Sequence, residues 1–333
     1  MPLGHCTNSQ CTAGDTGFCH LNKDQPADCP NWEPTIGSKA TATKKPASKT
    51  VSGKQSSPVE SSGVEWNGHS FGLPQLELVS RRANPLLIAT VGEVYAGKSS
   101  FLGMLHTLLL RGYELANYTF AGSLTLTGWE ALASALRFQR GEATDQAPTP
   151  SEPGYYSILH WALRHTNGQL RDILFPDASG EVFSQWAANR TDSNAENVRW
   201  IHQNADAFLL FINCQALVEK RGAASNSLLN LASQLTHELN GRPVLVAWSK
   251  ADYLEQVRPT VKESLETRLI DILGPLNSFE ISKELFDLPE PRQLANLRLV
   301  DAALSAVEAY RPLKPVIALD PHTTDHFLLY RGK

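Results

Sequence analysis

The chain has 333 residues, a formal net charge of −4 and a hydrophobic content of 42%, and these values exclude several classes of protein. The length suits one large α/β domain with appendages or two modest domains. The slight negative charge argues against nucleic acid or an anionic membrane as a direct partner. The start of the chain lacks a basic segment followed by an apolar core, and no apolar run approaches the roughly 18 residues of a membrane span. We therefore expect a soluble, cytoplasmic protein.

The cysteines gather at the start of the chain. Four of the five lie within the first 29 residues, namely Cys6, Cys11, Cys19 and Cys29. Four thiolates can bind Zn²⁺ tetrahedrally, and a stretch with so few aliphatic residues needs such a staple to fold. The spacings contain no C-x2-C pair, so His5 or His20 could replace one thiolate, and a disordered cysteine-bearing tail is the alternative. Residues 1–34 are predicted to form a small cysteine-rich zinc module.

The remaining chain divides by composition. Residues 35–63 are rich in Ser, Thr, Lys and Ala, which predicts a flexible linker. Residues 64–312 carry the predicted main domain, with an insertion at about 113–154, and residues 313–333 form a C-terminal tail.

Within the main domain, buried strands alternate with amphipathic helices. The expected elements, in chain order, are a strand at Leu76–Val79, a buried strand at Leu86–Val91, a helix at Ser100–Leu110, a helix at Gly128–Arg137 capped by Thr127, a hairpin of Tyr155–Arg164 and Leu170–Phe175, strands at Ala207–Ile212 and Val244–Trp248, and helical stripes around Leu228–Leu239, Val261–Ile272 and Leu297–Val307. This alternation predicts a mostly parallel sheet with helices on both faces, and the hairpin adds one antiparallel strand. The fold class is therefore an α/β three-layer sandwich.

The octapeptide GEVYAGKS matches the phosphate-loop pattern G-x-x-x-x-G-K-[ST]. It lies between the strand at Leu86–Val91 and the following helix, which is the context that the pattern needs. Lys98 is expected to pair with β- and γ-phosphate oxygens, and Ser99 to coordinate Mg²⁺. The predicted nucleotide-binding residues here are Gly92, Glu93, Val94, Tyr95, Ala96, Gly97, Lys98, Ser99 and Ser100.

Two further segments follow predicted strands, at the sheet edge where ligands of open α/β sheets bind. In DASGE, the carboxylate of Asp177 can hold Mg²⁺ and the N–H of Gly180 can approach a γ-phosphate. In SKAD, which comprises Ser249, Lys250, Ala251 and Asp252, the aspartate can accept from both N1–H and the 2-amino group of guanine. Adenine lacks that pair of donors and would leave the carboxylate unsatisfied.

The order GEVYAGKS, DASGE, SKAD resembles the guanine-nucleotide motifs of Ras-like P-loop small GTPases of the TRAFAC class, and the antiparallel hairpin before DASGE matches that fold. A broader likeness is to the double-GTPase families of bacterial conflict systems. The resemblance implies GTP hydrolysis with Mg²⁺ and a switch threonine, for which Thr149 is the best placed and Thr144 the second candidate. It also implies a base-contacting motif after SKAD, for which Glu280–Lys283 is a weak candidate.

The chain departs from the Ras-like pattern at informative positions. Glu181 stands where the water-orienting glutamine usually is, and Val94 and Tyr95 crowd the entry of an arginine finger. The expected catalytic residues are therefore Lys98, Glu181 and Thr149, with slow hydrolysis in the absence of a protein partner.

Three functions fit these motifs. The first is a regulatory GTPase that contacts an effector or activating protein, with a second GTPase as one candidate. The second is a nucleotide-locked module that recruits a partner and scarcely hydrolyses. The third, which SKAD disfavours, is a P-loop ATPase or kinase.

Overall fold

The computed structural model describes residues 68–80, 84–136, 149–282 and 294–310, and the backbone of four short strands outside these ranges. The chain divides into two compact units, residues 1–61 and 62–333. In the first unit, β1 (Gly4–Cys6) pairs antiparallel with β2 (Trp32–Pro34). The side chains of the four N-terminal cysteines and the predicted linker lie outside the described residues.

The second unit is built on a seven-stranded sheet with the order β11-β10-β9-β3-β8-β7-β4. The strands are β3 (Leu86–Val91), β4 (Tyr118–Gly122), β7 (Ile158–His165), β8 (Leu170–Pro176), β9 (Ala207–Asn213), β10 (Val244–Ser249) and β11 (Asn277–Ile281). Only β7 runs against the other strands of this sheet, because it pairs antiparallel with both β8 and β4. A mostly parallel sheet with one reversed strand, as predicted, is confirmed.

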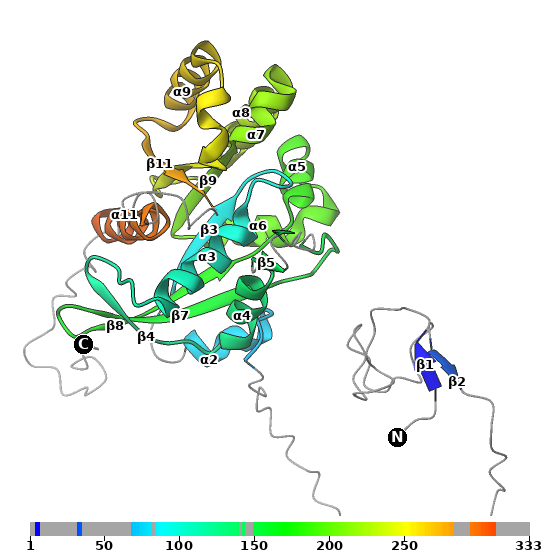
Figure 1. The fold of residues 1–333 in the computed structure, drawn as a ribbon, viewed down its shortest axis with the longest axis vertical. Coiled ribbons are helices and arrows are strands. Elements are labelled where there is room, and N and C mark those ends of the chain that lie inside the picture. Colours follow the sequence, from blue (N-terminus) through cyan, green and yellow to red (C-terminus); the bar gives the residue numbers. More distant parts are fainter. Residues whose placement is uncertain are drawn as a thin grey trace, which may run out of the picture. The chain divides into compact units, whose positions relative to one another are not determined.

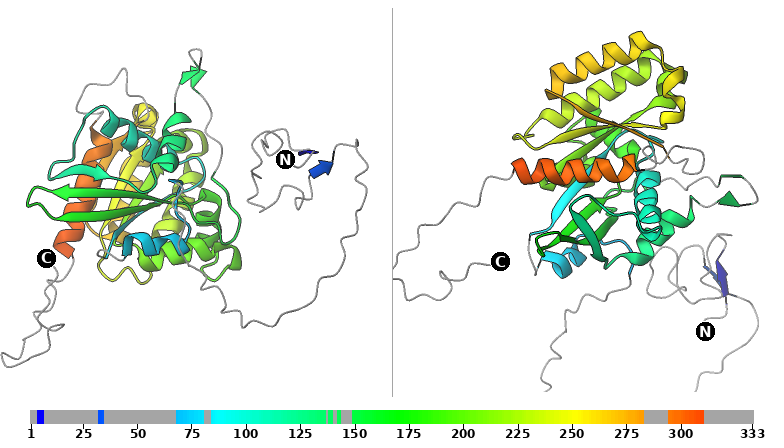
Figure 2. Two further views of the ribbon diagram at one scale, coloured as in Figure 1. Left: turned by 90° about the horizontal axis from the view of Figure 1, so that it is seen from below. Right: turned by 60° about the vertical axis from the view of Figure 1, so that its left-hand side comes forward.

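Helices cover both faces of this sheet (Figure 1). One layer holds α3 (Lys98–Leu110), α4 (Leu126–Ser134) and α11 (Ala295–Tyr310), and Figure 2 shows α11 alongside α3. The other layer holds α5 (Gly180–Ala188), α6 (Glu196–Asn204), α7 (Cys214–Lys220), α8 (Gly222–Thr236) and α9 (Pro259–Leu273). Short elements complete the unit: η2 (Pro74–Leu76), α2 (Glu77–Ser80), β5 (Phe138–Gln139), β6 (Glu142–Ala143), η3 (Ser193–Ala195) and η4 (Ala251–Gln256).

The central strands are buried on both faces, and their side chains point alternately into two hydrophobic cores. In β9, Phe208, Leu210 and Ile212 pack toward α5 and α8. Leu209 and Phe211, which point the opposite way, pack toward α3 and α11. A strand with a partner layer on each face must be apolar at every position, which explains why the sequence shows continuous apolar runs.

The structure corrects two details of the sequence analysis. Leu76–Val79 is not a strand: Pro74 begins the 3-10 turn η2, and α2 follows at once. The apolar side chains of Leu73, Leu76 and Val79 recur every third residue, a helical spacing, and pack on the same core. The helix expected at Gly128–Arg137 begins two residues earlier, at Leu126, with Thr125 rather than Thr127 at its N-cap position.

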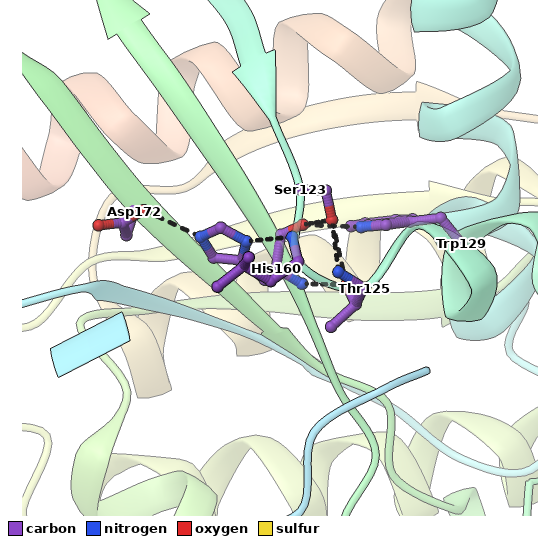
Figure 3. Close-up of polar contacts among 6 residues, drawn as sticks. Ser123, Thr125, Trp129, His160 and Asp172 are labelled. Carbon is purple, nitrogen blue, oxygen red and sulfur yellow. Dashed lines mark hydrogen bonds and ion pairs between the residues drawn. The ribbon is translucent and has the colours of Figure 1, made fainter. Parts of the chain in front are cut away.

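The edge strand β4 was not predicted, and a buried network attaches the segment that follows it to the sheet (Figure 3). The Nδ1 atom of His160 accepts from Leu124 N–H at 3.0 Å, so Nε2 carries the proton and meets the Asp172 carboxylate at 2.9 Å. The carbonyl oxygen of His160 accepts from Ser123 Oγ and from Trp129 Nε1. One strand residue thus holds the entry to α4 through its ring and its backbone.

Replacing His160 by leucine is expected to lower the free energy of unfolding by about 3 kcal/mol, because the buried Asp172 carboxylate and the Leu124 N–H would each lose a partner. Urea denaturation monitored by tryptophan fluorescence measures the change. His237→Leu, at an exposed histidine, serves as the control and should change the stability by less than about 0.5 kcal/mol. Equal effects of the two substitutions would contradict a structural role for this network.

Candidate functional site

The predicted phosphate loop connects the buried strand β3 to the first turn of α3. Gly97, at the N-cap position of α3, has a φ of 86°, a left-handed value that glycine adopts without strain. Gly92 lies so close to β9 that an added Cβ would be 3.0 Å from the Cβ of Phe211. The loop therefore wraps tightly over the start of α3, where free backbone N–H groups favour an anion.

Lys98 folds back beneath this loop. Its Nζ donates to the carbonyl oxygens of Gly92 at 2.9 Å and Glu93 at 3.1 Å, and the residue is only 5% exposed. Burial lowers the pKa of Lys98 to about 8, and the charges of Asp177 and Glu93 offset part of that shift. The amine thus donates to two carbonyl oxygens, and phosphate oxygens could take their place.

Three oxygen-bearing side chains converge beside Lys98. Ser99 Oγ donates to Asp177 Oδ1 at 2.8 Å and lies 3.0 Å from Thr149 Oγ1, which is also 3.4 Å from Asp177 Oδ2. Burial raises the pKa of Asp177, whereas the Ser99 hydrogen bond and the Lys98 charge act against that rise. Thr144, the alternative switch threonine, lies outside the described residues.

These three residues come from separate elements. Ser99 lies in the first turn of α3, Asp177 directly follows β8, and Thr149 lies in the segment leading to β7. Hydroxyl and carboxylate oxygens are the ligands that Mg²⁺ takes in proteins, so the set fits that ion. This set has only one carboxylate. A metal site of another kind, built from three or more His, Cys, Asp or Glu side chains, is absent from the residues that the structure describes.

The segment after Asp177 touches the phosphate loop directly. Ser179 caps α5 by accepting from Glu181 N–H at 3.3 Å. An added Cβ on Gly180 would lie 2.2 Å from the backbone N of Val94, so only glycine permits this approach. Glu181 itself is exposed. The N-terminus of α5 therefore lies in contact with the loop, at one side of the candidate site.

The SKAD segment lies at the end of β10. Buried Ser249 donates through Oγ to the carbonyl oxygen of Ile212 at 3.0 Å. Lys250 has a left-handed φ of 53°, and its Nζ donates to Gln215 Oε1 at 2.7 Å. Asp252 is exposed and accepts from Ser282 Oγ at 3.3 Å. Ser282 belongs to the weak candidate segment Glu280–Lys283 and follows β11, the neighbour of β10.

SKAD and the phosphate loop are near neighbours: an added Cβ on Gly97 would lie 3.8 Å from the Cβ of Ser249. The structure therefore brings the three predicted motifs to one edge of the sheet.

The sequence analysis missed Asn213, the last residue of β9. Its Nδ2 donates to the carbonyl oxygen of Tyr95 at 3.1 Å, while its Oδ1 caps α7 by accepting from Ala216 N–H. Tyr95 has a left-handed φ of 59°, which is unusual for a bulky residue, and its side chain is 73% exposed. Asn213 thus steadies the loop at its strained residue. Its place at the end of a buried strand was the only signal for it.

None of the helices in the described ranges is long and apolar enough to cross a membrane.

The profile of the Double-GTPase 2 family matches residues 86–302, which include all three motifs. No curated protein gives a significant match. A similar solved structure is that of a putative nucleolar GTP-binding protein 1 from Plasmodium falciparum, with 12% identity, a TM-score of 0.41, and coverage of 68% of this chain and 89% of that one. On the family match, this chain belongs to the Double-GTPase 2 family of P-loop GTPases.

Proposed function

We propose that this protein binds GTP and GDP with Mg²⁺ and hydrolyses GTP to GDP and phosphate, slowly unless a protein partner assists. The observation that carries the proposal is the convergence of Ser99, Thr149 and Asp177 next to a buried lysine, with contacts of 2.8 to 3.4 Å among their oxygens. The family match supports guanine nucleotide as the ligand class.

Each residue has a distinct part in binding. Lys98 would exchange the carbonyl oxygens of Gly92 and Glu93 for β- and γ-phosphate oxygens, and the loop N–H groups would hold the rest of the polyphosphate. Ser99 and Thr149 would hold Mg²⁺ through their hydroxyl oxygens, and the carboxylate of Asp177 would be the third protein group beside the ion. The ion, when bound, neutralises charge that develops on the phosphate oxygens.

The base would be recognised at the SKAD end of the site. The carboxylate of Asp252 accepts from Ser282 in the protein, which steadies it for the two parallel donors of guanine. Lys250, whose stem can pack over a base, is held by Gln215. Adenine offers no such donor pair, so this arrangement argues against an ATPase or kinase.

Slow hydrolysis is proposed because of the residues at and beside the phosphate loop. Glu181 is exposed and carries a negative charge where a neutral amide would orient water. Val94 and Tyr95 add bulk at the loop, and the Tyr95 ring projects into solvent. A nucleotide-locked module that recruits a partner is the second candidate, and these same two features favour it.

The remaining proposals concern partners and place. We expect a protein effector or activating partner, with a second GTPase as a candidate, and action in the cytoplasm. The four cysteines Cys6, Cys11, Cys19 and Cys29 are proposed to bind Zn²⁺ on the chemistry of thiolates alone, and metal analysis of the purified chain that finds no zinc would refute this.

Displacement of a bound fluorescent guanine nucleotide by GTP and by ATP tests the base assignment. The affinity for GTP is expected to exceed that for ATP by at least about a hundredfold. Asp252→Asn should lower the affinity for GTP by about a hundredfold and raise the affinity for XTP, because an amide N–H can donate to the 2-carbonyl of xanthine. Asp271→Asn, in the exposed part of α9, is the control. Unchanged GTP affinity in the Asp252 variant would refute guanine recognition at this residue.

Glu181→Gln decides between the GTPase and the locked module. If Glu181 occupies the water-orienting position, the neutral amide should raise the single-turnover rate of GTP cleavage by roughly tenfold or more. Glu255→Gln, at another exposed glutamate, should leave the rate unchanged. No detectable cleavage in either the wild type or the Glu181 variant would favour the locked module.

The lowered pKa of Lys98 predicts that nucleotide binding depends on pH. The pKa is about 8, so the amine loses its proton as the pH rises through 8, whereas a polyphosphate binds the charged amine. Binding therefore takes up a proton, and the dissociation constant should be roughly tenfold higher at pH 9 than at pH 7.

Displacement of a fluorescent guanine nucleotide at saturating Mg²⁺ measures this change. Inorganic tripolyphosphate, which has no base, serves as the control competitor and should show the same slope. A dissociation constant that stays flat between pH 7 and pH 9 for both ligands would contradict the assignment to Lys98.

A further inference from the structure

A tight turn lies between Thr149, in the candidate metal site, and the start of β7, and Tyr155 is its last residue. Tyr155 N–H donates to the carbonyl oxygen of Glu152 at 3.1 Å, with Pro153 and Gly154 as the central residues of the turn. Gly154 has a φ of 77°, and proline followed by a left-handed glycine is the signature of a type II turn. Thr149 lies on the arm that enters the turn and Tyr155 on the arm that leaves it.

The returning arm is fixed by α6. Asn197, which is 1% exposed, donates through Nδ2 to the carbonyl oxygen of Tyr155 at 3.1 Å. The next residue, Tyr156, sets its ring edge-on against Trp200, with the centroids 5.7 Å apart. A buried amide and an aromatic contact thus hold this short stretch of backbone in one orientation.

The same stretch continues the pairing of β7 with β8, since Asp177 N–H donates to the carbonyl oxygen of Ser157 at 2.8 Å. Successive side chains of an extended segment point to opposite faces. Because Tyr156 faces α6, Tyr155 faces the other way, toward the Asp177 side.

The surroundings of the Tyr155 ring agree with this placement. Burial raises the pKa of Tyr155, a side-chain hydrogen bond with Ser157 lowers it, and the Asp177 charge raises it again. The phenol therefore stays protonated and able to donate near the carboxylate of the candidate metal set. The ring remains 36% exposed, which leaves room for a ligand to reach it.

We propose that the Tyr155 hydroxyl donates a hydrogen bond to the terminal phosphate of bound GTP, so that this residue helps the site to distinguish GTP from GDP. The inference rests on the proposed function. Thr149 and Asp177 flank the side of the loop where the last phosphate would lie. Tyr155 follows Thr149 on an arm that Asn197 holds, and its hydroxyl senses the Asp177 charge. The exposed Glu181 carboxylate offers no donor there.

Tyr155→Phe removes the hydroxyl and keeps the ring, and Tyr156→Phe at the adjacent tyrosine is the matched control. Displacement of fluorescent GDP by GDP and by the β,γ-imido analogue of GTP, with saturating Mg²⁺, measures both affinities. In Tyr155→Phe, the dissociation constant of the GTP analogue should rise about tenfold, as expected for one hydrogen bond to a charged group. The constant for GDP should change less than about twofold, and Tyr156→Phe should change both constants by less than that.

Two results would overturn the inference while leaving the proposed function intact. One is wild-type affinity of Tyr155→Phe for both ligands, and the other is an equal loss for the GTP analogue and GDP. If the wild-type protein binds neither ligand, the proposed function fails and the inference fails with it.

Discussion

The candidate site depends on burying one amine. Lys98 lies almost out of reach of solvent beneath its own loop, and a buried ammonium is costly unless acceptors surround it. In the protein these acceptors are two carbonyl oxygens of the loop and the nearby charge of Asp177. A polyphosphate with its metal ion would be a stronger partner for the same amine. The loop is thus arranged around a charge that its own backbone satisfies only in part.

The sheet makes this arrangement possible. Parallel strands β3, β8, β9 and β10 all end at one edge, so Ser99, Asp177, Asn213 and Ser249 meet there although they are far apart in sequence. The strands that end at or lead to these residues are buried on both faces. The close approach of Gly180 to the loop belongs to the same geometry, because a side chain there would force α5 and the loop apart.

The sequence predicted the parts of the site that follow local rules. The phosphate loop, DASGE and SKAD were found because each follows an apolar strand, and the profile of the Double-GTPase 2 family spans all three. Asn213 and the His160–Asp172 pair were missed, since their partners are distant in sequence and single polar residues have no pattern. The short strand β4 was not predicted for a related reason. It is an edge strand with exposed residues, so it lacks the continuous apolar run of the central strands.

Thr149 was predicted to be a site residue from its place before the hairpin, and its hydroxyl lies next to that of Ser99. The segment between Thr149 and β7 is short, turns at Pro153 and Gly154, and is held to α6 by Asn197. Within β7, His160 ties the strand to the entry of α4, which lies inside the predicted insertion and before Thr149 in the sequence. The same strand therefore anchors both flanks of the segment that carries Thr149.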